Sequence, residues 1–106
     1  MVERDVIWSQ TAIDQFKRLL FFWEANEVDK KFREYIITRL DEHLKVLLNY
    51  PKCGKPYGIS KIREFVFDGF SLLYLVRPKK IIVYLFWDNR QDPAKLKYLL
   101  SNSLQN

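Results

Sequence analysis

Hydrophobic side chains recur at helical spacing along the first quarter of the chain. One apolar stripe comprises Ala12, Ile13, Phe16, Leu19, Leu20 and Trp23. This spacing of three and four residues predicts an amphipathic helix that ends near Asn26. Two N-caps are available at its start: Thr11, with Asp14 three residues later in a box-like arrangement, and Ser9.

A second apolar stripe follows after a link of only one or two residues. It comprises Val28, Phe32, Ile36, Leu40, Leu44, Leu47 and Leu48. The helix that it predicts begins around Val28 and stops at Pro51, because proline cannot continue the hydrogen-bond ladder and constrains the residue before it. Two helices with so short a link favour an antiparallel helical hairpin.

The second half of the chain has a strand-like pattern. Residues 51–58 hold two of the three glycines and two of the four prolines, so we expect a loop without regular structure there. Three runs rich in β-branched, aromatic and aliphatic residues then predict strands at 61–67, 70–76 and 81–87. The dipeptide Asp68-Gly69 has the composition of a type I′ turn, which predicts a hairpin between the first two strands.

The last two runs are joined by a four-residue turn in which Pro78 suits the second position. The three runs therefore predict an antiparallel meander. Its middle strand is apolar on both faces, so we expect it to be central. The helical hairpin would then cover one side of that strand and another element the other side.

The two ends complete the predicted architecture. Residues 2–8 predict a short edge strand, and Asp92 and Pro93 suit the N-cap and first position of a last helix at 94–100. The pattern as a whole predicts one α+β domain spanning residues 1–106. It consists of a helical hairpin packed on an antiparallel sheet, with a short N-terminal strand, a three-stranded meander and a short C-terminal helix.

The net charge of +5 is unevenly distributed along the chain. Residues 1–50 carry eight Lys/Arg and nine Asp/Glu, a net of −1, whereas residues 51–106 carry ten and four, a net of +6. A one-sided basic field attracts phosphates, acidic proteins or anionic lipids. The candidate phosphate-binding cations of this half are Lys52, Lys55, Arg77, Lys79, Lys80 and Lys95.

Composition narrows the chemistry that the chain can perform. The single cysteine, Cys53, excludes an intramolecular disulfide, and with one histidine no familiar zinc spacing exists, so we expect no metal and no cofactor. His43 lies in the middle of a predicted helix beside Leu44 and is expected to pack at the core boundary. Apolar runs of about 18 residues and a signal-peptide plan are both missing, so we expect a cytoplasmic protein without a membrane partner.

Aromatic residues make up 16% of the chain, and the stripes do not accommodate all of them. Trp87 fits the pattern less well than the others. Phe21 and Phe22 fall off the first helical stripe, where they either form an exposed apolar patch that marks a partner site or enlarge the core. The stripes place four aromatic residues in the core: Trp8, Phe16, Trp23 and Phe32.

Three cations of the sheet half form a candidate phosphate site. Lys61 and Arg63 are two residues apart in a predicted strand, so their side chains are expected on one face, and Arg90 follows the last strand. One lysine and two arginines in a cleft can hold a phosphate and stabilise charge developing on it. The alternative is that Lys61 and Arg63 are ordinary solvent-facing charges, and that Arg90 pairs with Asp88 or Asp92.

A series of motifs, in order along nearly the whole chain, resembles the RelE/ParE toxin superfamily. They are Val-Ile-Trp-Ser-Gln-Thr-Ala at 6–12, Asn-Tyr-Pro at 49–51, Lys-Ile-Arg-Glu-Phe at 61–65, Asp-Gly-Phe-Ser-Leu-Leu-Tyr-Leu-Val at 68–76 and Asp-Asn-Arg-Gln-Asp-Pro-Ala-Lys-Leu at 88–96. The resemblance implies a toxin of a type II toxin–antitoxin system, held inactive by a cognate antitoxin in a hetero-oligomer. That antitoxin is expected to bring an acidic and apolar segment that wraps the basic half.

The superfamily contains two modes of action. RelE-like members cleave mRNA on the ribosome without a metal, which would make this chain an endoribonuclease. ParE-like members are the alternative, and they poison DNA gyrase without cleaving nucleic acid. A further alternative is an inactive or non-toxic interaction module.

The ribonuclease mode makes specific demands on this sequence. By resemblance it implies catalytic roles for Lys61, Arg63, Arg90 and Tyr98. The chain departs from the family pattern at Ser71, where an arginine is expected after the glycine–aromatic pair of the hairpin. Arg77 is then the candidate to replace that cation in space.

Overall fold

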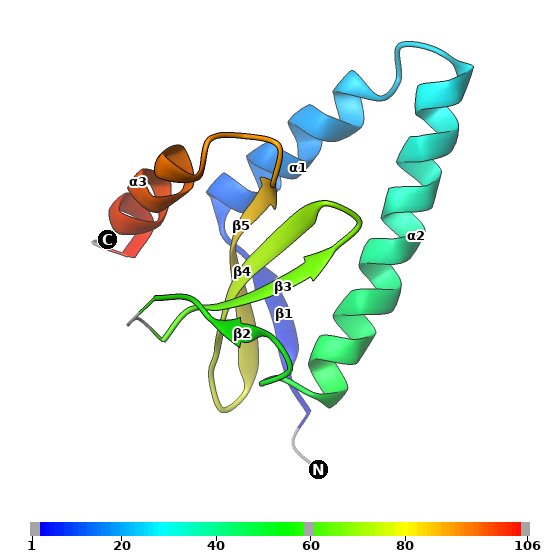
Figure 1. The fold of residues 1–106 in the computed structure, drawn as a ribbon. Helices are drawn as coiled ribbons and strands as arrows, with labels where there is room; N and C mark the ends of the chain where they lie inside the picture. Colours follow the sequence, from blue (N-terminus) through cyan, green and yellow to red (C-terminus); the bar gives the residue numbers. More distant parts are fainter. Residues whose placement is uncertain (1–2, 59–60, 105–106) are drawn as a thin grey trace.

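The computed structural model describes residues 3–58 and 61–104. These residues form an α+β fold, as predicted, and Figure 1 shows the elements in chain order. The elements are β1 (Asp5–Trp8), α1 (Gln10–Phe22), α2 (Glu27–Asn49), β2 (Lys55–Pro56), β3 (Arg63–Phe67), β4 (Phe70–Val76), β5 (Lys80–Asp88) and α3 (Pro93–Leu104).

The helical hairpin is present, but its first helix is shorter than predicted. The N-cap of α1 is Ser9, whose Oγ accepts a hydrogen bond from Ala12 N at 3.0 Å and donates one to Tyr84 O at 2.7 Å. This second bond anchors the start of α1 to β5. Thr11, the other predicted N-cap, lies inside the helix and does not cap it. The predicted end near Asn26 and the link of one or two residues are wrong. The helix ends at Phe22, because Asn26 serves as the N-cap of α2 and accepts from Asp29 N at 2.9 Å.

The sheet has five strands within the described residues, in the order β1-β5-β4-β3-β2. The predicted meander β3-β4-β5 is antiparallel and β4 is central, but β1 pairs parallel to β5 and makes the sheet mixed. Side-chain periodicity does not encode strand direction, which here depends on how the helices return the chain. The prediction that 51–58 has no regular structure is also wrong, because Lys55 and Pro56 form the edge strand β2 on β3.

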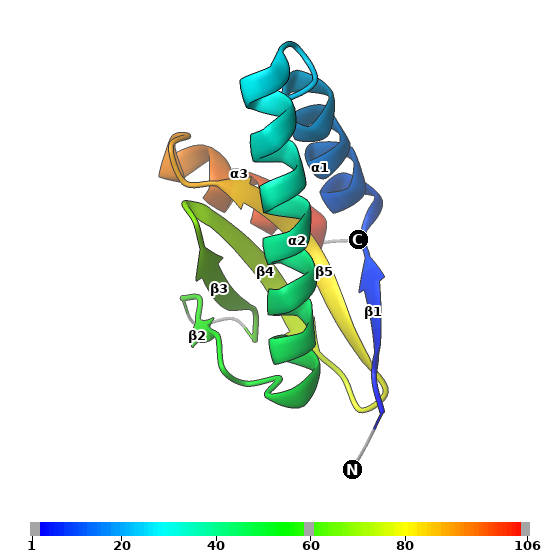
Figure 2. The same ribbon diagram turned by 90° about the vertical axis from the view of Figure 1, so that its right-hand side faces the viewer.

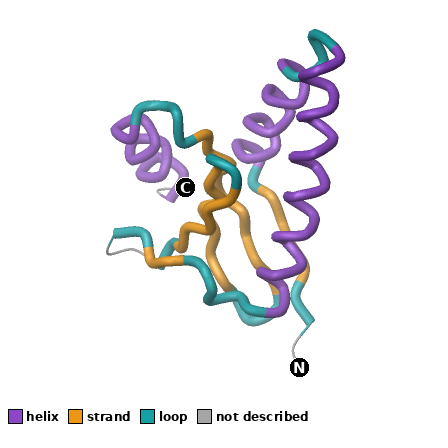
Figure 3. The backbone as a smooth tube through the Cα atoms, turned by 45° about the vertical axis from the view of Figure 1, so that its right-hand side comes forward, coloured by secondary structure: helices purple, strands orange, loops and turns teal. Residues whose placement is uncertain are grey.

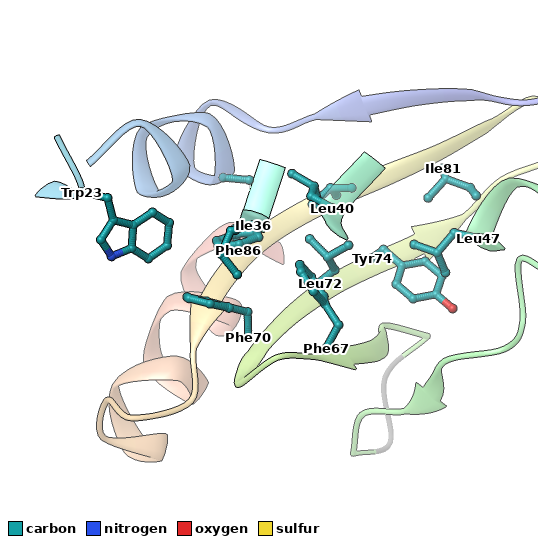
Figure 4. Close-up of a cluster of buried hydrophobic side chains, with 12 residues drawn as sticks. Trp23, Ile36, Leu40, Leu47, Phe67, Phe70, Leu72, Tyr74, Ile81 and Phe86 are labelled. Carbon is teal, nitrogen blue, oxygen red and sulfur yellow. The ribbon is translucent and has the colours of Figure 1, made fainter. Parts of the chain in front are cut away.

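Helices cover both faces of the sheet. Figures 1 and 3 show α2 on one side of the strands and α3 on the other, and Figure 2 shows α2 running along the front of the sheet. Residues Phe70 to Leu75 of β4 are accordingly all buried, which confirms the predicted two-sided cover. The apolar cluster beneath the hairpin is drawn in Figure 4 and includes Ile36, Leu40, Leu47, Phe67, Phe70, Leu72, Ile81 and Phe86. The cluster beneath α3 includes Ile62, Leu73, Leu75, Leu85, Trp87, Leu96 and Leu100.

Turn chemistry fixes the meander as predicted. Asp68 and Gly69 have φ values of 50° and 84°, the left-handed conformation that a type I′ turn requires at both positions. The turn between β4 and β5 is closed by a hydrogen bond from Arg77 N to Lys80 O at 2.8 Å. At the start of α3, Asp92 Oδ1 accepts from Ala94 N at 3.0 Å, and the helix runs on to Leu104, past the predicted end.

The aromatic residues divide between core and surface. Trp23 is buried, and Trp8 and Phe16 are partly buried against Phe86, but Phe32 is 37% exposed and does not belong to the core as predicted. Phe32 lies edge-on to Trp23 with ring centroids 4.9 Å apart, so it covers the outer end of the core instead of filling it. Phe21 and Phe22 are 81% and 70% exposed, so they do not enlarge the core and instead form the exposed apolar patch given as the other possibility.

His43 packs at the core boundary, as predicted. Its ring lies 5.2 Å from the Phe65 ring and 4.8 Å from the Phe67 ring, measured between centroids. Burial, reinforced by the nearby Arg39 guanidinium, lowers the pKa of His43. Among the described residues, no helix is long and apolar enough to cross a membrane.

Candidate functional site

Arg63 anchors a loop instead of lining an open cleft. Its Nη1 donates to Gly54 O at 2.7 Å and to Lys52 O at 3.1 Å, so the guanidinium holds the chain that follows α2. Tyr74, its partner in the β3–β4 register, donates to Pro51 O at 2.8 Å and accepts from Gly54 N at 2.9 Å. The two side chains together fix residues 51–54 against the sheet.

The packing around this anchor is tight. Tyr74 is fully buried, and burial raises the pKa of its hydroxyl. A Cβ atom added to Gly54 would lie 2.6 Å from Tyr74 Oη and 2.8 Å from Glu64 O, too close for a side chain. Glycine is therefore required at this position because of the close approach of the neighbouring chain.

The predicted strand start at residue 61 is wrong, so the strand spacing that placed Lys61 on one face with Arg63 does not apply. The strand β3 begins at Arg63, and Lys61 lies in a bend before it with an exposed side chain. The residue between them, Ile62, is buried under α3, and its carbonyl accepts from Tyr57 N at 2.8 Å. Arg63 instead lies on the face of Phe65 and Phe67, which pack beneath the helical hairpin.

Arg90 sits at the opposite end of β3 from Arg63. Its Nη2 lies 2.7 Å from Asp88 Oδ2 and its Nε lies 2.9 Å from Asp88 Oδ1, so the pairing with Asp88 proposed as the alternative is present. The hydrogen bonds from Arg90 lower the pKa of Asp88, and the Asp88 carboxylate raises the pKa of Arg90. The guanidinium also lies 6.0 Å from the centroid of the Phe70 ring.

The strand register separates the two arginines. Arg63 pairs with Tyr74, whereas Phe67 pairs with Phe70 and Phe70 with Asp88, so the two sites are four strand positions apart. At about 3.3 Å per residue this is a separation of roughly 13 Å along the sheet. The structure does not bring Arg63 and Arg90 together into one cleft.

A carboxylate lies beside Ser71, the position where the ribonuclease pattern has an arginine. Ser71 is fully buried and donates to Glu64 Oε2 at 2.7 Å, while Asn89 Nδ2 donates to Ser71 Oγ at 2.8 Å. Glu64 and Ser71 are diagonal neighbours on the α3 side of the β3–β4 hairpin. Burial and then the charge of Glu64 raise the pKa of Tyr57 next to it.

Our sequence reasoning missed Glu64 and Asn89 as members of this cluster. The signal that reveals Glu64 is the Asp68-Gly69 turn, because counting back from the turn fixes which β3 residues face Ser71. Arg77 does not replace the missing arginine, since it lies six residues from Ser71 at the other end of β4, roughly 20 Å away. Tyr98 lies on α3 with 66% of its surface exposed.

Four of the six candidate phosphate-binding cations gather at one end of the molecule. Lys52 follows α2, and Arg77, Lys79 and Lys80 form the β4–β5 turn, which lies at the same end in Figures 1 and 2. Arg4 joins them through a hydrogen bond of 2.9 Å from its Nε to Arg77 O. We call this surface the basic pole and define it as Arg4, Lys52, Arg77, Lys79 and Lys80.

The remaining two cations lie elsewhere. Lys55 is exposed on the edge strand β2. Lys95 is on α3 and lines a cleft of about 320 Å³ between α1, β5 and α3, together with Arg18 and Asp14. A groove of about 580 Å³ lies instead at the basic pole, where Arg4 and Lys52 flank Tyr50 and Val76.

Comparison with known proteins places the chain in a family. The family model for the ParE toxin of the type II toxin–antitoxin system parDE matches residues 6–93. A search of the curated proteins finds no match.

Solved structures share the fold. The chromosomal ParDE system of P. aeruginosa matches with a TM-score of 0.68 and 14% identity, covering 81% of this chain and 96% of that one. The isolated E. coli toxin RelE matches with a TM-score of 0.55 and 14% identity, covering 93% and 98% of the two chains. A mutant of E. coli RelE in the free state matches with 0.55 and 16%, covering 98% and 97%. The resemblance to the RelE/ParE superfamily is thus confirmed, and the chain belongs to the ParE toxin family, the toxin component of type II toxin–antitoxin systems, which implies an antitoxin as its partner.

Proposed function

We propose that this toxin acts by binding its target, as a ParE-type poison of DNA gyrase, and not by cleaving mRNA. The observation that carries the proposal is the Glu64–Ser71–Asn89 cluster on the sheet face beneath α3. Cleavage of RNA by its own 2′-hydroxyl needs cations that stabilise the negative phosphorane. The Glu64 carboxylate, which lies beside Ser71, would repel the phosphate of an RNA bound there and destabilise that transition state.

The positions of the candidate catalytic cations support the same proposal. The Arg63 guanidinium is engaged by two backbone carbonyls and the Arg90 guanidinium by a carboxylate. The Asp88 carboxylate offsets the charge that Arg90 could offer a phosphate, and Arg63 holds the loop that follows α2. Loss of one preorganised donor to a developing oxyanion costs an enzyme about 2.7–4 kcal/mol of transition-state stabilisation, and Ser71 lacks the cation that the ribonuclease pattern has there. The match to the ParE toxin model agrees with a non-nucleolytic mode.

Two reactions with the purified chain test the proposal. In the first, gyrase and supercoiled plasmid are incubated with the chain and then treated with detergent and protease, which converts a trapped cleavage complex into linear DNA. In the second, ribosomes translating a defined mRNA are incubated with the chain, and truncated mRNA is mapped. Plasmid without gyrase and mRNA without ribosomes are the matched controls for contaminating nucleases.

We expect linear plasmid only when gyrase is present. We expect the mRNA to stay intact on the ribosome. Cleaved mRNA that depends on the ribosome, with no effect on gyrase, would overturn the proposal in favour of the RelE-like mode.

A further inference from the structure

The basic pole gathers five cations at one end of the molecule. Several cations elsewhere are paired with carboxylates, among them Arg39 with Asp68, Lys45 with Asp41 and Arg90 with Asp88. Across residues 3–58 and 61–104, none of the ion pairs involves a member of the basic pole. Because opposite charges nearby weaken a surface field, five cations without an ion pair to a described residue at one end of the molecule give this surface a positive potential.

Hydrogen bonds hold two separate segments of the pole together, residues 4–5 and residues 77–80. Arg4 Nε donates to Arg77 O at 2.9 Å, and Asp5 N donates to Lys79 O at 3.1 Å. Arg77 N donates to Lys80 O at 2.8 Å and closes the turn between them. The two segments are therefore fixed relative to each other, while the exposed side chains of Lys79 and Lys80 can follow a ligand.

An aromatic side chain stands beside the charge. Tyr50 is the C-cap of α2, is 68% exposed, and lines the groove of about 580 Å³ with Pro51 and Val76. Arg4 and Lys52 flank the same groove. The loop that forms its floor is held by Arg63 and Tyr74, so the groove is preformed. The Tyr50 ring could stack on a nucleic-acid base, and Arg4 and Lys52, which line the same groove, could bind the neighbouring phosphates.

We propose that the basic pole binds single-stranded nucleic acid, with phosphates on its cations and one base stacked on Tyr50. Charge complementarity requires a polyanion, and the exposed tyrosine selects one with unstacked bases. A duplex keeps its bases inside and leaves Tyr50 unused. The inference does not depend on which enzyme or machine the toxin inhibits.

Fluorescence anisotropy with a labelled oligothymidylate of about 20 nucleotides tests the proposal, using the full chain over a range of salt concentrations. Affinity should fall with salt, and each pole cation removed should reduce the slope of log affinity against log salt by about 0.7. The variant K79A/K80A tests this, with K17A/K31A as a control of equal net charge whose lysines are exposed on α1 and α2. Tyr50→Ala should weaken binding roughly 10-fold, the effect of losing one base–aromatic stack. Phe21→Ala, which removes a ring that is 81% exposed at the other end of the hairpin, is its control.

Each other outcome overturns the proposal. If duplex DNA binds as tightly as the single strand and Tyr50→Ala has no effect, the pole is only a diffuse electrostatic field. If K17A/K31A weakens binding as much as K79A/K80A does, the binding surface is not the pole. If the oligonucleotide does not bind but a poly-glutamate peptide does, the partner is an acidic protein.

Discussion

Replacing Arg63 with methionine separates a structural role from a catalytic one. The change keeps an unbranched side chain of similar length and removes the donor that reaches Gly54 O at 2.7 Å and Lys52 O at 3.1 Å. Hydrogen bonds from a charged group contribute about 1.5–3 kcal/mol each when buried. Because the Lys52 bond is exposed and the Gly54 bond half-buried, we expect a total loss of about 1–3 kcal/mol in the free energy of unfolding.

For a chain of this size, a loss of 1–3 kcal/mol corresponds to a fall in Tm of about 4–12 °C. Circular dichroism during heating and urea titration both measure the loss. Lys61→Met is the matched control, since Lys61 is exposed and lies outside the strand, and its stability should stay within about 0.5 kcal/mol of the wild type. A double-mutant cycle with Tyr74→Phe should show coupling of at least about 0.5 kcal/mol, because both side chains hold the same loop. An Arg63→Met protein as stable as the wild type would refute the anchoring role and return Arg63 to the list of candidate catalytic residues.

Three further perturbations test other parts of the structure. Gly54→Ala should destabilise the chain by about 1–3 kcal/mol in urea titration, because its Cβ would lie 2.6 Å from Tyr74 Oη; an unchanged midpoint would mean that the loop moves freely. Arg90 lowers the pKa of Asp88, so the stabilisation is present above the unfolded pKa of about 3.9 and is lost as pH falls through the folded pKa. The stability difference between wild type and Arg90→Ala should therefore be full at pH 7 and vanish well below pH 4, and a difference independent of pH would contradict this. Burial lowers the pKa of His43, so its contribution is full above the unfolded value of about 6.5 and is lost as pH falls below that value. The wild type should lose stability between pH 7 and pH 5, and His43→Gln should lose less over the same range.

Local chemistry explains why much of the fold could be predicted from the sequence. Asp68-Gly69 requires the left-handed backbone that the structure has, and the doubly apolar run from Phe70 onward can only be a central strand. Pro93 after Asp92 likewise marks the start of α3 by backbone geometry alone. These signals depend on residues adjacent in the chain, so periodicity and turn chemistry are enough to find them.

The features that were missed depend on contacts between distant segments. Ser9 is the cap of α1 partly because it also bonds to Tyr84 O, and the parallel pairing of β1 follows from the path of two helices. The start of the third strand was mispredicted as well: the pattern placed Lys61 in the same strand as Arg63, but β3 begins only at Arg63. The basic pole likewise depends on Arg4, which reaches Arg77 across the sheet from the other end of the sequence.

The most direct test of the binding mode is made in growing bacteria. The chain is induced without its antitoxin, and DNA and protein synthesis are pulse-labelled separately over the first minutes. If the chain poisons gyrase, DNA synthesis falls first, the DNA-damage response is induced, and mRNA stays intact. Early loss of protein synthesis with cleaved mRNA, while DNA synthesis continues, would contradict this mode.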